Sequence, residues 1–446
     1  MSRIATFAWI ALAACSSDSL ELPEVRGLTA VPDTSEEEGV VEVELIASET
    51  FVEWVDGGST AVWTYNGSVP GPLIQAQVGD TLRVHFTNSL SESTTIHWHG
   101  LRIPDDMDGV PMIQAPIEPG ESFTYEFTLP DAGTFWYHPH VRSHEQIERG
   151  LQGMLVVHEA EPPAFDVERA FVIDDVLLQD SGRMSGFGLS GMNAVHGRHG
   201  NALLVNGSMD AIDDAVAPGT VERWRIVNTA NARTMWINVE NADWRVVAID
   251  GTSLADPLSA RRLQLPVGRR FDLEVVVSRD VAPVLNVELP AGGAQWDAYP
   301  MFTPTLTEMG ESGTFLPWSA PALTPQAAVE QEVEVVFGVQ GGPVWTINGS
   351  AFDPMETIEV DAGVPTRITV RDTTGAEHPF HLHGQFFEVL SRSDGVAWPG
   401  RLDTALISPG ETVELYTTFD NPGTWMAHCH ILEHAELGMM TTFTAE

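Results

Sequence analysis

Short apolar runs dominate the chain after about residue 40. Runs of roughly four to eight residues, in which apolar and polar side chains often alternate, are separated by Gly, Pro, Asn and Asp. Examples are VEVELIASETF, TLRVHFTN, SFTYEFTLP and VEVVF. Alternation with a period of two places every second side chain on one face of a strand, and long stretches with helical periodicity are scarce. The pattern predicts an all-β protein built from sandwiches.

An internal repeat divides this pattern into three. The tripeptide Asn-Gly-Ser occurs at 66–68, 206–208 and 348–350, with starting points 140 and 142 residues apart. After each copy an apolar strand ends in a polar pair, namely Asn88-Ser89, Asn228-Thr229 and Asp372-Thr373. Repeats of this length indicate duplicated domains of ordinary size. We therefore expect three β-sandwich domains, at 39–160, 161–325 and 326–446.

The first 38 residues have a different composition. Residues 1–15, with Arg3, an apolar run and small residues before Cys15, predict a secretory signal. The ending Leu-Ala-Ala-Cys is typical of bacterial lipoproteins, so we expect Cys15 to be lipidated and the protein to lie in the cell envelope, in the periplasm. An ordinary signal peptide is the alternative. Residues 16–38 are rich in Ser, Asp, Glu and Pro and predict a flexible acidic tether.

The charge is strongly negative. Asp and Glu number 63 against 22 basic residues, all of them arginine, which gives a formal net charge of −41. This balance argues against nucleic acid as a partner and favours high solubility. We interpret it as a solvated acidic surface rather than a specific channel for cations. Contact with a membrane is expected only through the N-terminal lipid.

Ten of the fifteen histidines lie in four short motifs. The motifs are His97-Trp98-His99, His138-Pro139-His140, His378-Pro379-Phe380-His381-Leu382-His383, and His428-Cys429-His430 with His434 shortly after it. In an extended strand, His428 and His430 point to one side and Cys429 to the other. One tripeptide can therefore serve two metal sites.

The face of the strand to which Cys429 points is predicted to hold a copper site. A thiolate with His434 five residues later and Met439 ten residues later supplies three ligands of a trigonal His₂Cys site with a weak axial thioether, which selects blue copper. A second imidazole has to come from elsewhere, and the segment beginning at His378 is the best candidate.

In these four motifs, their order and their spacing, the chain resembles the multicopper oxidases, a family that includes laccases and bacterial cuprous oxidases. The resemblance implies three cupredoxin-like domains, the middle one without copper ligands. It also implies four copper ions, one of type 1, one of type 2 and two of type 3. The implied ligands are His378, Cys429, His434 and axial Met439 for type 1; His97 and His381 for type 2; and His99, His138, His430 and His140, His383, His428 for the type 3 pair.

Three further positions bear on the chemistry. Asp108 matches the acidic residue with which the family delivers protons to its oxygen site, although Asp108-Gly109 is also a common turn sequence. Many bacterial relatives have an acid directly after the last type 1 histidine, where this chain has Ala435, and we expect Glu436 to point elsewhere. The glycine-rich loop 181–201, with two Met and two His, is either an accessory copper or substrate-access loop or a flexible surface loop.

The resemblance implies an oxidase that couples four one-electron oxidations at the type 1 copper, through Cys429, to reduction of O₂ to water. We expect laccase-like oxidation of phenols and aromatic amines. The first alternative is oxidation of Cu(I) or another low-valent metal ion in periplasmic copper tolerance, but residues 373–377 contain neither Met nor Asp. The second alternative is a non-catalytic copper-binding or scaffold protein on the same fold.

Overall fold

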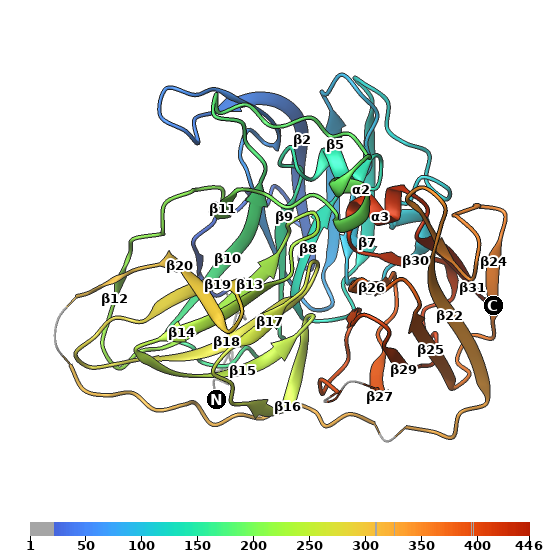
Figure 1. Ribbon diagram of the computed structural model, residues 1–446. Helices are drawn as coiled ribbons and strands as arrows, with labels where there is room; N and C mark the ends of the chain where they lie inside the picture. Colours follow the sequence, from blue (N-terminus) through green and yellow to red (C-terminus); the bar gives the residue numbers. More distant parts are fainter. Residues whose placement is uncertain (1–21, 308–309, 325, 394, 396) are drawn as a thin grey trace, which may run out of the picture.

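The chain folds into three two-sheet units that follow one another in sequence (Figure 1). The computed structural model describes residues 22–446 except 308, 309, 325, 394 and 396. The predicted signal peptide and its Cys15 lie outside the described residues. Nearly all regular structure in the described part is strand, so the predicted all-β class is confirmed. The domain boundaries near 160 and 325 stay predictions.

The strands of each unit form two sheets. In the first unit these are β3 (Thr60–Tyr65), β2 (Val40–Val52), β5 (Thr81–Asn88) and β7 (Ser122–Thr128), and β4 (Gly71–Gln77), β9 (Gly153–His158), β8 (Gly133–His138) and β6 (His97–His99). In the third unit they are β23 (Val344–Ile347), β22 (Gln331–Gln340), β25 (Thr366–Asp372), β29 (Thr412–Thr417) and β27 (Glu388–Arg392), and β24 (Thr357–Val360), β31 (Met440–Ala445), β30 (Gly423–Cys429), β26 (His378–Leu382) and β28 (Thr404–Ile407).

The second unit has the largest sheet. It consists of β1 (Val25–Arg26), β10 (Val167–Val176), β13 (Val221–Asn228), β18 (Arg270–Val277), β15 (Ala242–Ile249) and β16 (Thr252–Leu258), with β11 (Ala202–Val205) paired to β10. The second sheet is β17 (Leu263–Leu265), β14 (Met235–Glu240), β19 (Val284–Gly292) and β20 (Gln295–Phe302), and a small ribbon joins β12 (Ala215–Val216) to β21 (Thr305–Leu306).

Helices are few and short in the described part of the chain. They are α1 (Ser143–Gln146), α2 (Met192–His196) and α3 (Leu432–Glu436), with a 3₁₀ turn, η1, at Asp105–Met107. Among the described residues no helix is long and apolar enough to cross a membrane.

The repeated Asn-Gly-Ser motif has the same conformation and the same hydrogen bonds in all three units. Asn66, Asn206 and Asn348 all have left-handed backbones, with φ of 54°, 48° and 52°. Each side-chain oxygen accepts a hydrogen bond from a backbone N–H of β2, β10 or β22, and each amide nitrogen donates to a carbonyl of the same strand. Asparagine tolerates this conformation and can bond locally. The predicted threefold repeat is therefore a structural repeat.

The start of the described chain corrects one expectation. The segment 16–38 was expected to be a flexible tether, but Val25 is buried and pairs with Glu168 as β1 of the second unit's main sheet. Further on, the Val31 N–H donates to Leu73 O of the first unit at 2.9 Å. The apolar side chains of Val25 and Leu28 pack into an apolar cluster between the first two units, and this packing fixes the acidic segment to the fold.

The two terminal units meet where the histidine motifs lie. In Figure 1 the first unit (blue to cyan) stands at the top, the second (green to yellow) at the lower left and the third (orange to red) at the right. One apolar core fills the first unit, and a second core runs through the second and third units. The sheet containing β6 and β8 faces the sheet containing β26 and β30, because His99 of β6 stacks on His381 of β26.

Candidate metal centres

Strand pairing aligns the histidine motifs within each unit. In the first unit β6 and β8 are antiparallel, with His97 opposite His138. In the third unit β26 and β30 are antiparallel, with His381 opposite His428. Side chains of opposed residues lie on the same face of a sheet. Each unit thus contributes four imidazoles to one face.

The two faces combine into one cage of eight histidines. Rings from opposite units stack on each other, with centroids 3.7 Å apart for His99 and His381 and 3.9 Å apart for His97 and His383. Four triads each offer ring nitrogens that lie within 4.8 Å of one another. They are His97, His138, His140; His97, His99, His381; His99, His138, His430; and His140, His383, His428.

Backbone carbonyls fix which nitrogen of several rings faces inward. The Nδ1–H groups of His97, His138, His381 and His428 donate to the carbonyls of Asp108, Pro139, Asp403 and Cys429, at 2.9 to 3.1 Å. Since a carbonyl only accepts, each Nε2 then carries a bare lone pair. Among the described residues, the buried Nε2 atoms of His97, His138 and His381 have no hydrogen-bond partner. Inward lone pairs without partners are the donor set that a metal ion requires.

Burial holds seven of the eight cage rings neutral. It lowers the pKa of His428 to about 4, and the neighbouring His97 adds to the effect. Burial also lowers the pKa values of His99, His138, His140, His381, His383 and His430 well below the ordinary value. Neutral imidazole is the ligand form, so the cage binds cations without first losing protons at neutral pH.

A second, separate cluster surrounds Cys429 on the other side of β30. His378 Nδ1 lies 3.3 Å from Cys429 Sγ, His434 Nδ1 lies 3.8 Å from it, and the two Nδ1 atoms are 3.3 Å apart. All three residues are buried. Burial raises the pKa of the Cys429 thiol, so a thiolate there requires a bound cation. Met439 is also fully buried, and its carbonyl accepts from the Cys429 N–H at 3.1 Å.

The outer ring nitrogens of this cluster are also anchored. Thr374 Oγ1 lies 2.7 Å from His378 Nε2, and Val195 O accepts from His434 Nε2 at 3.2 Å. Each Nδ1 lone pair can therefore point at the sulfur. Burial lowers the pKa of His378 to about 4 and that of His434 to about 3.

Helix α2 covers the cluster. Val195 bonds to His434, and Ala194 O accepts from Trp345 Nε1 at 2.8 Å, while the Trp345 ring lies 3.9 Å from the His434 ring. As a result His434 is 0% exposed. The sequence left the loop 181–201 open between an accessory copper or substrate-access loop and a flexible surface loop. Its α2 part is packed directly over the Cys429 cluster, while Met192 and Val195 themselves remain exposed at the surface.

Cys429 joins the two clusters through the backbone. His428 belongs to the triad with His140 and His383, and His430 belongs to the triad with His99 and His138. The alternation expected for residues 428–430 therefore places the sulfur one residue away from two separate triads of the cage.

Asp108 lies between two cage rings. Its Oδ2 is 2.7 Å from His383 Nδ1 and its Oδ1 is 3.1 Å from His97 Nδ1, and it is fully buried. The next residue must be glycine: Gly109 has φ of 77°, and a Cβ there would lie 1.9 Å from Ile96 O. The turn that Asp108-Gly109 predicts is therefore present, and it places the carboxyl behind the cage. Proton delivery by Asp108 stays a prediction.

The sequence did not identify Asp403. Its carboxylate lies 3.2 Å from His99 Nε2 and pairs with Arg270 at 2.5 Å, while its backbone carbonyl accepts from His381. No motif surrounds Asp403, and backbone carbonyls carry no sequence signal. Only its place before β28, which pairs with β26, brings it to the cage.

One expectation about the last helix is wrong. Glu436 was expected to point away from the cage, but it lines a cavity of about 290 Å³ that His140 and His428 also line. Glu436 Oε2 lies 3.5 Å from His144 Nδ1. The short α3 turns Glu436 toward α1 of the first unit, although strand alternation or helix geometry counted from His434 was expected to point it elsewhere.

Comparisons with known proteins agree with this geometry. Three sequence profiles, each described as multicopper oxidase, match residues 48–162, 177–282 and 324–446. The multicopper oxidase MmcO of Mycobacterium tuberculosis is 30% identical over 97% of this chain and 93% of its own length. Laccase-1 of Botryotinia fuckeliana is 29% identical over 87% of this chain and 79% of its own.

Solved structures show the same architecture. The multi-copper oxidase from Pseudomonas thermotolerans superposes with a TM-score of 0.79 at 33% identity, over 91% of this chain and 99% of that one. The multicopper oxidase from Campylobacter jejuni, described as a metallo-oxidase, superposes with a TM-score of 0.83 at 27% identity, over 94% of each chain.

Proposed function

The chain belongs to the multicopper oxidase family, and from this premise we propose how its own residues hold the copper and which reductants it uses. The family is an oxidoreductase family with copper as cofactor and O₂ as electron acceptor. We assign His378, Cys429 and His434, with axial Met439, to type 1 copper and His97 and His381 to type 2. The two type 3 ions are assigned to His99, His138, His430 and to His140, His383, His428.

The geometric grouping carries this assignment. Every proposed set of three ligands coincides with a triad whose donor atoms lie within 4.8 Å of one another. When bound, the four copper ions supply four one-electron steps, which match the four electrons that O₂ needs to form water. The protein orients the rings through backbone carbonyls and excludes water from both clusters by burial.

Cys429 is the connection between substrate oxidation and the cage. Its sulfur lies against His378 and His434, and its two peptide neighbours are cage histidines. Cys429→Ser keeps the size and removes the soft ligand. We expect loss of the intense blue absorption and of O₂ uptake, with the eight cage histidines still binding copper, as measured by metal analysis. Unchanged blue absorption would contradict the type 1 assignment.

We propose that Asp108 delivers protons to the oxygen site. Its carboxyl lies within hydrogen-bond reach of His97 and His383, the closest approach of a carboxyl to both halves of the cage. Asp108→Asn retains the size and a hydrogen-bonding group but cannot transfer a proton as a carboxyl can. We expect turnover with O₂ to fall about 10²-fold or more. The blue absorption and copper content should stay as in the wild type; a parallel loss of copper would instead indicate a structural role.

For the reductant we propose phenols and aromatic amines, which the similarity to laccases supports. A low-valent metal ion, in copper tolerance, is the second candidate, and the covered His434 favours it. An aromatic ring cannot touch an imidazole that is 0% exposed, whereas a small ion at the surface of α2 needs only electron transfer through Val195.

Oxygen consumption separates these candidates. Holoprotein is compared with a panel of phenols, Cu(I) and Fe(II), with and without added Cu(II). Phenol turnover exceeding that of the metal ions supports the first candidate, and the reverse supports the second. A copper-loaded sample that shows neither the blue band nor O₂ uptake would point to a non-catalytic copper-binding protein.

We also propose that the protein is exported and anchored in the periplasm through lipidated Cys15. The support is the sequence of residues 1–15. Mass spectrometry of the mature N-terminus and detergent partitioning of the wild type and Cys15→Ala test this. Release of the variant, but not of the wild type, into the aqueous phase is the expected result, and equal partitioning would contradict it.

A further inference from the structure

Trp345 lies at the junction of the Cys429 cluster and α2. It belongs to β23 and its side chain is buried. The centroid of its ring lies 3.9 Å from that of His434 and 5.3 Å from that of His378. Its Nε1–H donates to Ala194 O of α2 at 2.8 Å. One side chain therefore contacts both imidazoles of the cluster and the helix that covers them.

Few hydrogen bonds hold α2 in place. Residues 188–197 make only two hydrogen bonds to the rest of the described chain. Trp345 Nε1 donates one of them to Ala194 O, and His434 Nε2 donates the other to Val195 O at 3.2 Å. His434 is itself a proposed copper ligand. Within the described part of the chain, Trp345 is thus the one residue outside the proposed ligand set that donates a hydrogen bond to α2.

Both ends of α2 are flexible by composition. The helix has five residues, and it is flanked by Gly191 with φ of 60° and Gly197 with φ of 73°. A Cβ at Gly191 would meet nothing within 4 Å, so that end is not packed against the fold. Glycine adopts many backbone conformations, and so short a helix has little stability of its own. The closed position of α2 therefore depends on its few contacts with the third unit.

We propose that Trp345 is a positioning residue that determines which reductants reach the proposed type 1 copper. Its Nε1–H keeps α2 closed over His434, which is 0% exposed in that position. A small metal ion at the surface of α2 gives up its one electron through Val195, whose carbonyl is bonded to His434. A phenol has to touch the imidazole, so it reacts only with the fraction of molecules in which α2 is open. The inference rests on the type 1 assignment proposed above.

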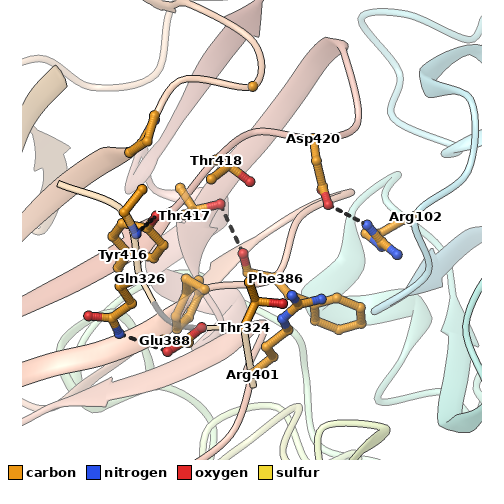
Figure 2. A pocket seen from close by; sticks show the side chains of 14 residues that line it. Arg102, Thr324, Gln326, Phe386, Glu388, Arg401, Tyr416, Thr417, Thr418 and Asp420 are labelled. Carbon is orange, nitrogen blue, oxygen red and sulfur yellow. Dashed lines mark hydrogen bonds and ion pairs between the residues drawn. The ribbon is translucent and has the colours of Figure 1, made fainter. Parts of the chain in front are cut away.

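The cavity shown in Figure 2 is a different place where an aromatic molecule could bind. It has about 360 Å³ and is lined by Phe386 and Tyr416, among others. None of its described lining residues belongs to α2 or to the Cys429 cluster. The hydroxyl of Tyr416 accepts from the Ala327 N–H at 3.1 Å and so holds a connecting segment, as Trp345 holds α2. Tyr416→Phe removes this bond and is therefore a control.

Hydrogen exchange tests the contact without reference to activity. Trp345→Phe keeps a ring over His434 and removes only the Nε1–H donor. Exchange of residues 188–200 in the holoprotein, followed by mass spectrometry, measures how often α2 opens. We expect the variant to exchange roughly 2- to 10-fold faster than the wild type, the factor that corresponds to loss of one hydrogen bond. Tyr416→Phe should leave this exchange unchanged, as should Trp318→Phe, which removes an Nε1 that donates to Leu254 O at 2.7 Å.

Steady-state oxygen uptake gives the second readout. In Trp345→Phe, kcat/KM for a dimethoxyphenol should rise by the same factor as the exchange rate, because only the open form reacts with the phenol. The value for Fe(II) should change little, and the blue absorption should stay as in the wild type. A general loss of structure would instead lower both values of kcat/KM.

Equal exchange in the wild type and Trp345→Phe, or a parallel change for both reductants, would overturn the proposal. If Trp345→Phe does not fold, Gly191→Ala takes its place, because a Cβ at φ of 60° strains the start of α2. The same faster exchange and the same difference between reductants are expected, and wild-type behaviour would overturn the proposal. Absence of blue absorption in the wild type would refute the type 1 assignment, while the exchange data would still decide whether Trp345 holds α2.

Discussion

At the scale of single residues, buried carboxylates and carbonyls orient the histidines. Asp403 is the clearest case, since its carboxylate contacts His99 and pairs with Arg270 while its carbonyl holds His381. Both Asp403 and Arg270 are 0% exposed. Without their ion pair, a charge would remain uncompensated in the protein interior. One residue therefore positions rings from both halves of the cage.

Asp403→Asn is expected to destabilise the protein by roughly 3 kcal/mol, because removing one partner leaves a buried charge uncompensated. The free energy of unfolding by urea, at equal copper content, measures the loss. Glu332→Gln, which breaks the exposed pair with Arg367, is the control and should change stability by no more than about 1 kcal/mol. Equal effects of the two substitutions would contradict the role assigned to Asp403.

His158 gives a pH dependence that is independent of copper. It is fully buried beside Gln75, and burial lowers its pKa from 6.5 to about 4. The unfolded chain therefore binds a proton at higher pH than the folded chain. Its contribution to stability is present above pH 6.5 and is lost as the pH falls through about 4.

The size of this effect follows from the shift, roughly 3 kcal/mol over that range. His158→Gln should lose correspondingly less stability between pH 6.5 and 4 than the wild type, as measured by urea unfolding at each pH. A His158→Gln variant with the wild-type slope would show that His158 does not titrate in this way.

At the scale of elements, alternation along strands explains which features of the fold and the metal centres could be predicted from the sequence. The faces of His428, Cys429 and His430 follow from the period of two, and the repeated asparagine turns follow from local chemistry. Helix α2 could not be predicted in the same way. It is five residues long, and its key contact to His434 is the carbonyl of Val195, which any residue would supply. Asp403 was missed because its position depends on strand pairing across the fold.

A substitution at Gly197 can displace helix α2, which covers His434. This glycine has φ of 73°, and a Cβ there would lie 2.3 Å from the Cβ of Ala232 and 2.7 Å from Ile431 Cγ2. Gly197→Ala should push α2 outward and uncover His434. We expect kcat/KM for bulky phenols to rise several-fold while that for Fe(II) changes little.

Gly186→Ala is the matched control, because it lies in the same loop and a Cβ there meets nothing within 4 Å. Its kinetics should equal those of the wild type. Steady-state oxygen uptake with both reductants decides the outcome. If Gly197→Ala leaves phenol oxidation unchanged while its blue absorption is intact, α2 does not limit access.

At the scale of the whole molecule, the net charge of −41 creates a field that attracts cations. Its reach shrinks from about 30 Å at 0.01 M salt to about 8 Å at 0.15 M. We expect kcat/KM for Fe(II) or Cu(I) to fall several-fold over that range. A neutral phenol, measured in the same buffers, should show no comparable change; parallel curves would mean that the field does not steer the reductant.

The division of the cage between the terminal units has a consequence for synthesis. His97, His99, His138 and His140 are made early, whereas the other four cage histidines and the whole Cys429 cluster are in the last seventy residues. A chain released before residue 378 therefore carries half a cage and lacks the Cys429 thiol. Such a fragment holds none of the proposed type 1 ligands, so the electron-entry route proposed for the complete chain is absent from it.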